Sequence, residues 1–165
     1  MIINYKVAIV LLLFSQLIFA KKVQTTVECA LVYRILHFVE LPQRNQYTLC
    51  VDSTTEEFDI FKKQLNGKEL NYKKMSIIRA TQSILKDCDL VYLGQSARLR
   101  NEQIHKEMEK KSLLVFSTTD DRKDISLVSF AIESNKVVFR VNKTLINKYN
   151  FHVSSKVLRL ASELY

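Results

Sequence analysis

The spacing of hydrophobic positions predicts a chain of alternating helices and strands. The first amphipathic helix begins at Thr25, whose spacing from Glu28 is that of a capping box, and Pro42 ends it. Its apolar residues recur at helical spacing, so we expect its buried face to hold Val27, Leu31, Ile35 and Phe38.

A strand and a second helix follow. The β-rich run Tyr47–Val51 predicts the strand, and Thr54 with Glu57 repeats the capping-box spacing at the start of the helix. Asn66 and Gly67 tolerate the left-handed backbone that ends many helices. The buried stripe of this helix is predicted to consist of Phe58, Phe61 and Leu65.

The strand-helix order then repeats. Short apolar runs predict strands, and the charged segment between the last two carries apolar residues at helical spacing. Because these strands are hydrophobic on both faces, they favour a mainly parallel sheet. The expected strands are Asn71–Ile78, Asp89–Leu93 and Leu113–Phe116, with a helical turn over Ser83–Lys86 and a helix face of Ala97, Arg100, Ile104 and Met108.

The C-terminal third changes to strict alternation of apolar and polar residues, which predicts a β-hairpin over residues 128–141. Asn142 and Ser154 are expected to cap two last helices, with Asn150 as the left-handed stop of the first. The inward face of the last helix is predicted to be Val157, Ala161 and Leu164. The fold class is therefore α/β: one domain, a mainly parallel central sheet with flanking helices, and a C-terminal antiparallel hairpin.

The N-terminus has the anatomy of a signal peptide. Lys6 precedes an apolar run over residues 7–20 with two polar breaks, and small Ala20 ends it. The run is shorter than the roughly 20 residues that a membrane-spanning helix needs. We predict a signal peptide over residues 1–20, cleaved after Ala20, and one exported domain over residues 21–165. An uncleaved membrane anchor is the alternative.

Charge and composition add little specificity. Without residues 1–20 the chain keeps 24 basic and 17 acidic residues, a formal net charge of +7. Such a surface serves solubility or contacts an anionic lipid, a cell-wall polymer or an acidic partner. Export argues against nucleic acid as a partner.

Motifs for catalysis or cofactor binding are missing from the sequence. Two isolated glycines, Gly67 and Gly94, cannot form a phosphate-binding loop. The histidines His37, His105 and His152 are far apart, and neither they nor the cysteines have the spacing of a metal site. We therefore predict a protein that is not an enzyme and that holds no metal and no cofactor.

Three cysteines remain in an oxidising compartment. Cys50 ends one predicted strand and Cys88 precedes another, so a disulfide between them would join neighbouring strands. Closing this loop would stabilise the fold by about 4 kcal/mol. Two buried thiols are the alternative. Cys29 is then left packed in the first helix or available for an intermolecular bond.

Four segments in this order resemble the YfiR/HmsC family of small exported proteins. Phe38–Pro42 (FVELP) is similar to the family's Phe-Val-Glu-Trp-Pro element. Tyr47–Val51 (YTLCV) and Leu85–Tyr92 (LKDCDLVY) resemble its two cysteine-bearing strands. Val137–Asn142 (VVFRVN) with Phe151–Ala161 (FHVSSKVLRLA) resembles its C-terminal ending.

The resemblance implies a non-enzymatic periplasmic regulator. It would bind and repress the periplasmic domain of a membrane signalling protein, either a diguanylate cyclase or a sensor kinase, and so affect cyclic di-GMP and biofilm formation. It would form a homodimer, and the Cys50–Cys88 disulfide would stabilise the fold and respond to redox conditions. The family-motif positions that are candidates for binding are Glu40, Asn142, Ser154, Ser155 and Arg159.

Two other functions stay open. A cleft or sheet edge of the same domain would suit a periplasmic sensor that binds a small molecule or a cell-wall fragment. A hydrolase would need a catalytic group assembled in space from distant residues, which the sequence does not reveal.

Overall fold

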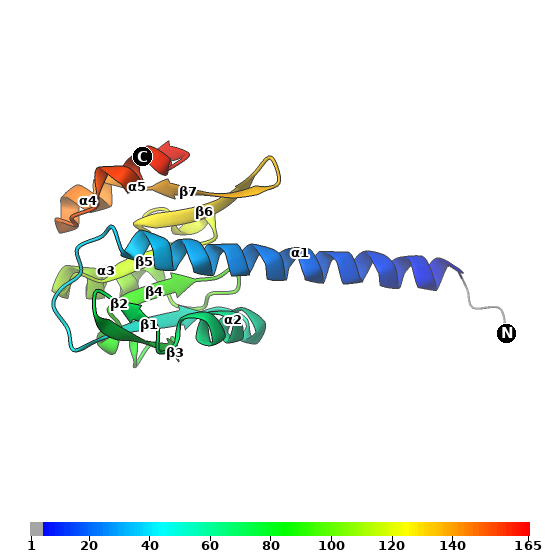
Figure 1. Ribbon diagram of the computed structural model, residues 1–165, viewed down its shortest axis with the longest axis horizontal. Helices are drawn as coiled ribbons and strands as arrows, with labels where there is room; N and C mark the ends of the chain where they lie inside the picture. The colour runs from blue at the N-terminus through cyan, green and yellow to red at the C-terminus, as the bar shows by residue number, and fades with distance from the viewer. Residues whose placement is uncertain (1–4) are drawn as a thin grey trace.

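An eight-stranded sheet organises the protein (Figure 1). The structure is a computed structural model that describes the backbone of residues 5–165 and the side chains of residues 20–165. The strands are β1 (Gln46–Asp52), β2 (Glu69–Leu70), β3 (Lys73–Arg79), β4 (Leu90–Leu93), β5 (Leu114–Ser117), β6 (Val128–Glu133), β7 (Lys136–Val141) and β8 (Glu163–Leu164). The helices are α1 (Tyr5–Leu36), α2 (Thr55–Leu65), α3 (Asn101–Lys110), α4 (Lys143–Tyr149) and α5 (Ser155–Leu160), with 3₁₀ turns η1 (Leu85–Asp87) and η2 (Asp120–Arg122).

The strand order is β2-β3-β1-β4-β5-β6-β7-β8. The five strands β3, β1, β4, β5 and β6 are parallel, whereas β2 and β7 run antiparallel to their neighbours β3 and β6. All four residues of β4 and of β5 are buried, as the runs hydrophobic on both faces predicted. The predicted α/β class, with a mainly parallel sheet and a C-terminal antiparallel hairpin, is confirmed.

The helices lie on both faces of the sheet. Along the strand order, the chain moves from β1 toward the β2 edge of the sheet to form β3, and from β4 toward the β8 edge to form β5. Because such crossovers are right-handed, α2 and α3 lie on opposite faces. Tyr92 of β4 contacts both α2, through the ring of Phe61, and α1, through Glu28, so α1 and α2 share a face.

Helix α1 differs from its prediction at both ends. It runs without a break from Tyr5 to Leu36, and its N-terminal part extends beyond the sheet (Figure 1). The predicted cap at Thr25 is wrong: this hydroxyl lies within the helix and donates to the carbonyl of Lys21 at 3.1 Å. Val27 and Phe38, predicted to be buried, are 38% and 41% exposed.

The buried face of α1 is rotated relative to the prediction because it contains polar residues. The carboxyl group of Glu28 is 2% exposed and accepts hydrogen bonds from the hydroxyl of Tyr92 at 2.6 Å and from the side-chain amide of Gln24 at 2.8 Å. A hydrophobic pattern alone cannot assign a buried carboxyl group to the core. Among the residues of α1 whose side chains are described, the buried ones are Thr25, Glu28, Cys29, Val32, Ile35 and Leu36.

Most predicted helix ends are confirmed. Thr54 and Glu57 form the capping box of α2, Asn142 caps α4, and Asn150 ends α4 in the left-handed conformation with a φ of 52°. Gly67 also has positive φ, 80°. Helix α3 begins at Asn101, so Ala97 and Arg100, which were expected on its face, precede the helix.

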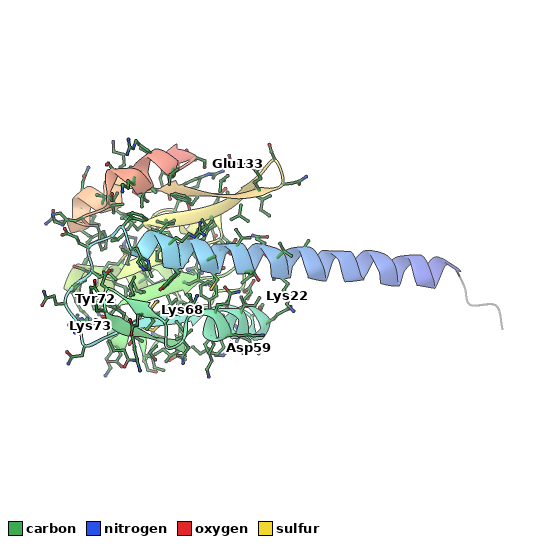
Figure 2. The ribbon with its side chains drawn as sticks, in the orientation of Figure 1. Lys22, Asp59, Lys68, Tyr72, Lys73 and Glu133 are labelled. Carbon is green, nitrogen blue, oxygen red and sulfur yellow. A yellow bond between two sulfur atoms is a disulfide. The ribbon has the colours of Figure 1, made fainter. Side chains whose placement is uncertain are left out.

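Two features at the edges of the sheet were not predicted from the sequence, namely the β2–β3 turn and the strand β8. A two-residue turn at Asn71 and Tyr72, both with positive φ, joins β2 to β3 and leaves Tyr72 96% exposed (Figure 2). At the other end β8 pairs with β7 in parallel. Leu164, predicted to face inward from the last helix, lies in β8 and is 43% exposed. This prediction is wrong because α5 ends at Leu160.

The predicted signal peptide falls mainly on residues whose side chains the structure does not describe, so cleavage after Ala20 stays a prediction. Among the described residues, no helix combines the length and the apolar character that crossing a membrane would take.

Candidate functional site

The disulfide lies at the centre of the sheet. The structure joins Cys50 of β1 to Cys88, which ends η1 just before β4, with 5.8 Å between their Cα atoms. Both residues are fully buried. The bridge therefore ties β1 to the start of its neighbour β4 in a place that water and a reductant reach only when the sheet opens.

Lys111 fixes the turn that carries Cys88. Its ammonium donates hydrogen bonds to the carbonyl oxygens of Lys86 at 2.6 Å and Leu85 at 3.2 Å, and also to the carbonyl of Cys88. Burial lowers the pKa of Lys111, while the nearby carboxylate of Asp89 acts in the opposite direction. Sequence reasoning missed this residue, because nothing in the pattern assigns a lysine in the loop before β5 to the carbonyls of η1.

The free cysteine, Cys29, is buried in α1. Burial raises the pKa of its thiol to about 12. Because the thiolate is the reactive form, the raised pKa and the burial of Cys29 disfavour its reaction in the folded protein. Of its two expected environments, the structure shows packing in the helix.

The segments after α1 and before α5 are held together in what we call the α1–α5 junction, residues 38–41 and 151–155. The N–H of Glu40 donates to the carbonyl of His152 at 2.9 Å, and the N–H of Ser154 donates to the carbonyl of Phe38 at 2.8 Å. These two bonds flank an antiparallel bridge between residues 39 and 153. The C-terminal motif is thus anchored to the end of α1.

A hollow of about 800 Å³ opens beside the α1–α5 junction. Glu40 and His152 lie at its surface, with 3.8 Å between a carboxylate oxygen and the imidazole Nδ1, and both side chains are more than half exposed. Ser154 also lines it, but its hydroxyl accepts the N–H of Lys156 and so caps α5. The hollow offers polar and aromatic contacts at an exposed surface, which suits binding.

A family model described as YfiR/HmsC-like matches residues 25–162. The chain belongs to this family. This match supports a periplasmic regulator, and the resemblance drawn from the sequence motifs is confirmed.

Two solved structures share the fold of this YfiR/HmsC-like chain. A conserved domain protein of Vibrio cholerae has 12% sequence identity and a TM-score of 0.57, over 86% of this chain and 60% of its own. An ABC domain of Streptococcus pneumoniae, solved in complex with L-Trp, has 7% identity and a TM-score of 0.52, over 81% of this chain and 61% of its own. Among curated proteins none matches.

The structure separates the motif positions of this YfiR/HmsC-like protein. Glu40 and Ser154 both line the hollow at the α1–α5 junction, whereas Ser155 and Arg159 are exposed on α5 and do not line it. Asn142 is buried elsewhere: its side chain accepts the N–H of Leu145 at 2.9 Å and donates to the carbonyl of Lys123 at 2.8 Å. Capping explains Asn142 and Ser154, so Glu40, Ser155 and Arg159 stay candidates for binding.

In the described part of the chain, no three His, Cys, Asp or Glu side chains cluster closely enough to hold a metal ion.

A second hollow, lined by arginines, lies at the carboxyl ends of β1, β3 and β4. Sequence reasoning missed it because its residues follow three different strands, and only the strand order brings them together.

Proposed function

We propose that this protein is exported and that it binds and represses a membrane signalling protein, namely a diguanylate cyclase or a sensor kinase. The observation that carries the proposal is the match of residues 25–162 to a family of periplasmic regulators. Repression of a cyclase would keep cyclic di-GMP low, and release of the cyclase would favour biofilm formation.

The α1–α5 junction is the proposed contact surface. Phe38 is 41% exposed there, and the ammonium of Lys156 lies 5.8 Å from the centroid of its ring. Aromatic side chains with charged neighbours are common anchors of protein interfaces. Glu40 adds an exposed negative charge at the junction, and Arg159 adds an exposed positive charge on α5, the helix that follows it. A junction fixed by backbone hydrogen bonds presents these groups without a large ordering cost.

The Cys50–Cys88 disulfide is the proposed redox-sensitive element. Its reduction would remove the cross-link between β1 and the start of β4 and would lower the stability of the whole sheet. Because the sulfurs are buried, reduction would follow a transient opening of the sheet. A loosened sheet would no longer hold the contact surface in the conformation that represses the partner. We also propose a homodimer, by analogy with the family.

Affinity capture from the native envelope tests this function. The exported protein is used as bait with and without a reductant, and the Cys29→Ala variant, which keeps the disulfide, serves as the matched control. We expect a membrane cyclase or sensor kinase to be recovered by the oxidised wild type and by Cys29→Ala, and less of it after reduction.

Each outcome of the capture has one meaning. Recovery of no membrane signalling protein in any condition would overturn the proposed function. Equal recovery with and without reductant would overturn the redox response and leave the partner in place.

A further inference from the structure

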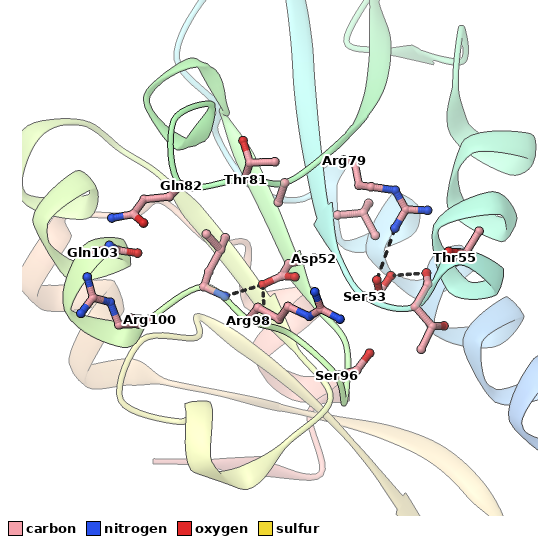
Figure 3. Close-up of a pocket in the computed structure, with 14 residues that line it drawn as sticks. Asp52, Ser53, Thr55, Arg79, Thr81, Gln82, Ser96, Arg98, Arg100 and Gln103 are labelled. Atoms are coloured by element: carbon pink, nitrogen blue, oxygen red, sulfur yellow. Dashed lines mark hydrogen bonds between the residues drawn. The ribbon is translucent and has the colours of Figure 1, made fainter.

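A cleft with a volume of about 790 Å³ lies at the carboxyl ends of β1 and β4, where the order of the strands along the sheet reverses (Figure 3). The chain leaves β1 toward one side of the sheet and leaves β4 toward the other, so the loops after these neighbouring strands separate. In open α/β sheets ligands bind in such a crevice, at the carboxyl ends of the strands. Here the walls come from residues 51–55, 79–82 and 96–103.

Three arginines give this cleft, which we call the switch-point cleft, a positive charge. Figure 3 shows Arg79 on one side of the cleft, Arg100 on the opposite side and Arg98 between them. Within residues 20–165 none of the three guanidinium groups makes an ion pair. Arginines that line one cleft without an ion-pair partner are suited to bind carboxylate or phosphate oxygens.

The one carboxyl group in the cleft is already used. Asp52 is 8% exposed, and its Oδ2 accepts the backbone N–H groups of Arg98 at 2.7 Å and Leu99 at 2.6 Å. These bonds fix the loop after β4 against the end of β1. Asp52 therefore shapes the cleft and forms no ion pair with its arginines, of which Arg79 donates a long hydrogen bond to the carbonyl of Ser53 at 3.5 Å.

The cleft is also held in shape from its other sides. A Cβ atom on Gly94 would lie 2.7 Å from the Cβ of Ser53, so the two loops touch and only glycine fits there. The guanidinium of Arg79 lies 4.3 Å from the ring centroid of Phe58. Behind the loop after β4, Arg122 donates to the carbonyl of Leu99 at 2.7 Å. A site fixed in this way binds with little ordering cost.

The remaining walls are both polar and apolar. Ser53, Thr55 and Thr81 line the cleft with polar groups, and Ala80 contributes apolar surface, with a small part from the edge of Leu99. A bare inorganic ion would use only the polar part. The mixture therefore matches an organic molecule with a charged end, of a size that a cleft of this volume accepts.

We propose that the switch-point cleft binds a small organic anion, with its phosphate or carboxylate group on Arg98 and a neighbouring arginine of the cleft, Arg79 or Arg100, and its apolar part on Ala80 and the edge of Leu99. The proposal does not depend on the partner proposed above. The switch-point cleft would be a separate ligand site at the carboxyl ends of the strands.

Titration followed by nuclear magnetic resonance tests the site. The ¹⁵N-labelled exported protein is titrated at constant ionic strength with phenyl phosphate, with benzoate and with neutral benzyl alcohol. We expect saturable shifts of the amides of residues 53–55 and 96–100 with at least one of the two anions, and no saturation with benzyl alcohol. Comparison of the two anions shows whether phosphate or carboxylate is preferred.

Two variants with the same loss of charge make the test specific. Arg98→Gln removes a guanidinium from the cleft, whereas Arg34→Gln removes an exposed one from α1. Loss of a charge-assisted contact predicts about tenfold weaker anion binding by Arg98→Gln and unchanged binding by Arg34→Gln. Absence of saturable shifts, or equal weakening by both variants, would overturn the site; at least one of Arg79→Gln and Arg100→Gln should have the same effect as Arg98→Gln.

Discussion

The centre of the sheet and the α1–α5 junction differ in how much of their chemistry is exposed. At the centre, Cys50, Cys88 and Tyr92 are fully buried among apolar strands. At the junction, Glu40 and His152 are more than half exposed, although the backbone beneath them is well bonded. The cysteine-bearing motifs of the family therefore lie in a buried environment, and its Phe38–Pro42 and C-terminal motifs lie partly at an exposed surface.

This difference teaches where each substitution should act. A change at a buried, cross-linked or hydrogen-bonded group alters the free energy of unfolding. An exposed side chain on a fixed backbone contributes little to stability and is free to act in binding. We therefore expect the sheet centre to control stability and the α1–α5 junction to control recognition.

Removal of the disulfide should have the largest effect. The double variant Cys50→Ser, Cys88→Ser loses a cross-link between residues 38 positions apart, and we expect it to unfold with a free energy about 4 kcal/mol smaller than the wild type. Urea titration of both proteins measures the difference.

A thiol count provides the control for the disulfide. The unfolded, unreduced wild type should show one free thiol, that of Cys29, and the Cys29→Ala variant should show none. Three free thiols in the wild type would mean that the proposed bridge is absent.

The hydrogen bond between α1 and β4 should have an intermediate effect. Tyr92→Phe removes the hydroxyl that donates to the buried carboxyl group of Glu28, and we expect a loss of about 1–3 kcal/mol in unfolding free energy. Glu28→Gln in the same background should recover part of this loss, because a neutral amide costs less to bury than an unpaired carboxylate. No recovery in the double variant would contradict the pairing.

The same carboxyl group predicts a pH dependence. Burial raises the pKa of Glu28, although the hydrogen bonds from Tyr92 and Gln24 act in the opposite direction. Folding therefore favours the protonated form, and the contribution of Glu28 to stability is full below its unfolded-state pKa and is lost as pH rises through the raised folded-state pKa. The stability of the wild type relative to Glu28→Gln should increase when pH is lowered from 7 toward 4. A difference that does not vary with pH would contradict the raised pKa.

Substitutions of exposed residues at the α1–α5 junction and on α5 should have the smallest effect on stability. Glu40→Ala and Arg159→Ala remove exposed side chains, and we expect each to change the unfolding free energy by no more than about 0.5 kcal/mol. Recovery of the membrane partner in affinity capture should nevertheless fall. Ser155→Ala, another exposed change on α5, tests how far the contact surface extends. Full recovery with both charge variants would move the proposed surface elsewhere.

The sequence predicted the parallel strands, the capped helices α2 and α4 and the hairpin because each depends on local spacing or local capping. It failed where distant contacts decide. The face of α1 depends on the pairing of Glu28 with Tyr92, 64 positions away, and the position of Leu164 depends on β8 pairing with β7. Neither contact leaves a local pattern.

The candidate sites divide in the same way. The placement of Cys50 in one strand and of Cys88 just before another followed from their positions at the ends of two apolar runs. Strand order could not be read from the same runs, so neither the meeting of Glu40 with His152 nor the switch-point cleft was predicted. Lys111 was missed for the same reason, because its acceptors are backbone carbonyls more than twenty residues away.

The most direct test of repression is the cellular concentration of cyclic di-GMP in the native organism with and without this protein. We predict that deletion raises the concentration, that the wild-type protein restores it, and that the Cys50→Ser, Cys88→Ser variant restores it incompletely. An unchanged concentration after deletion would contradict repression of a diguanylate cyclase.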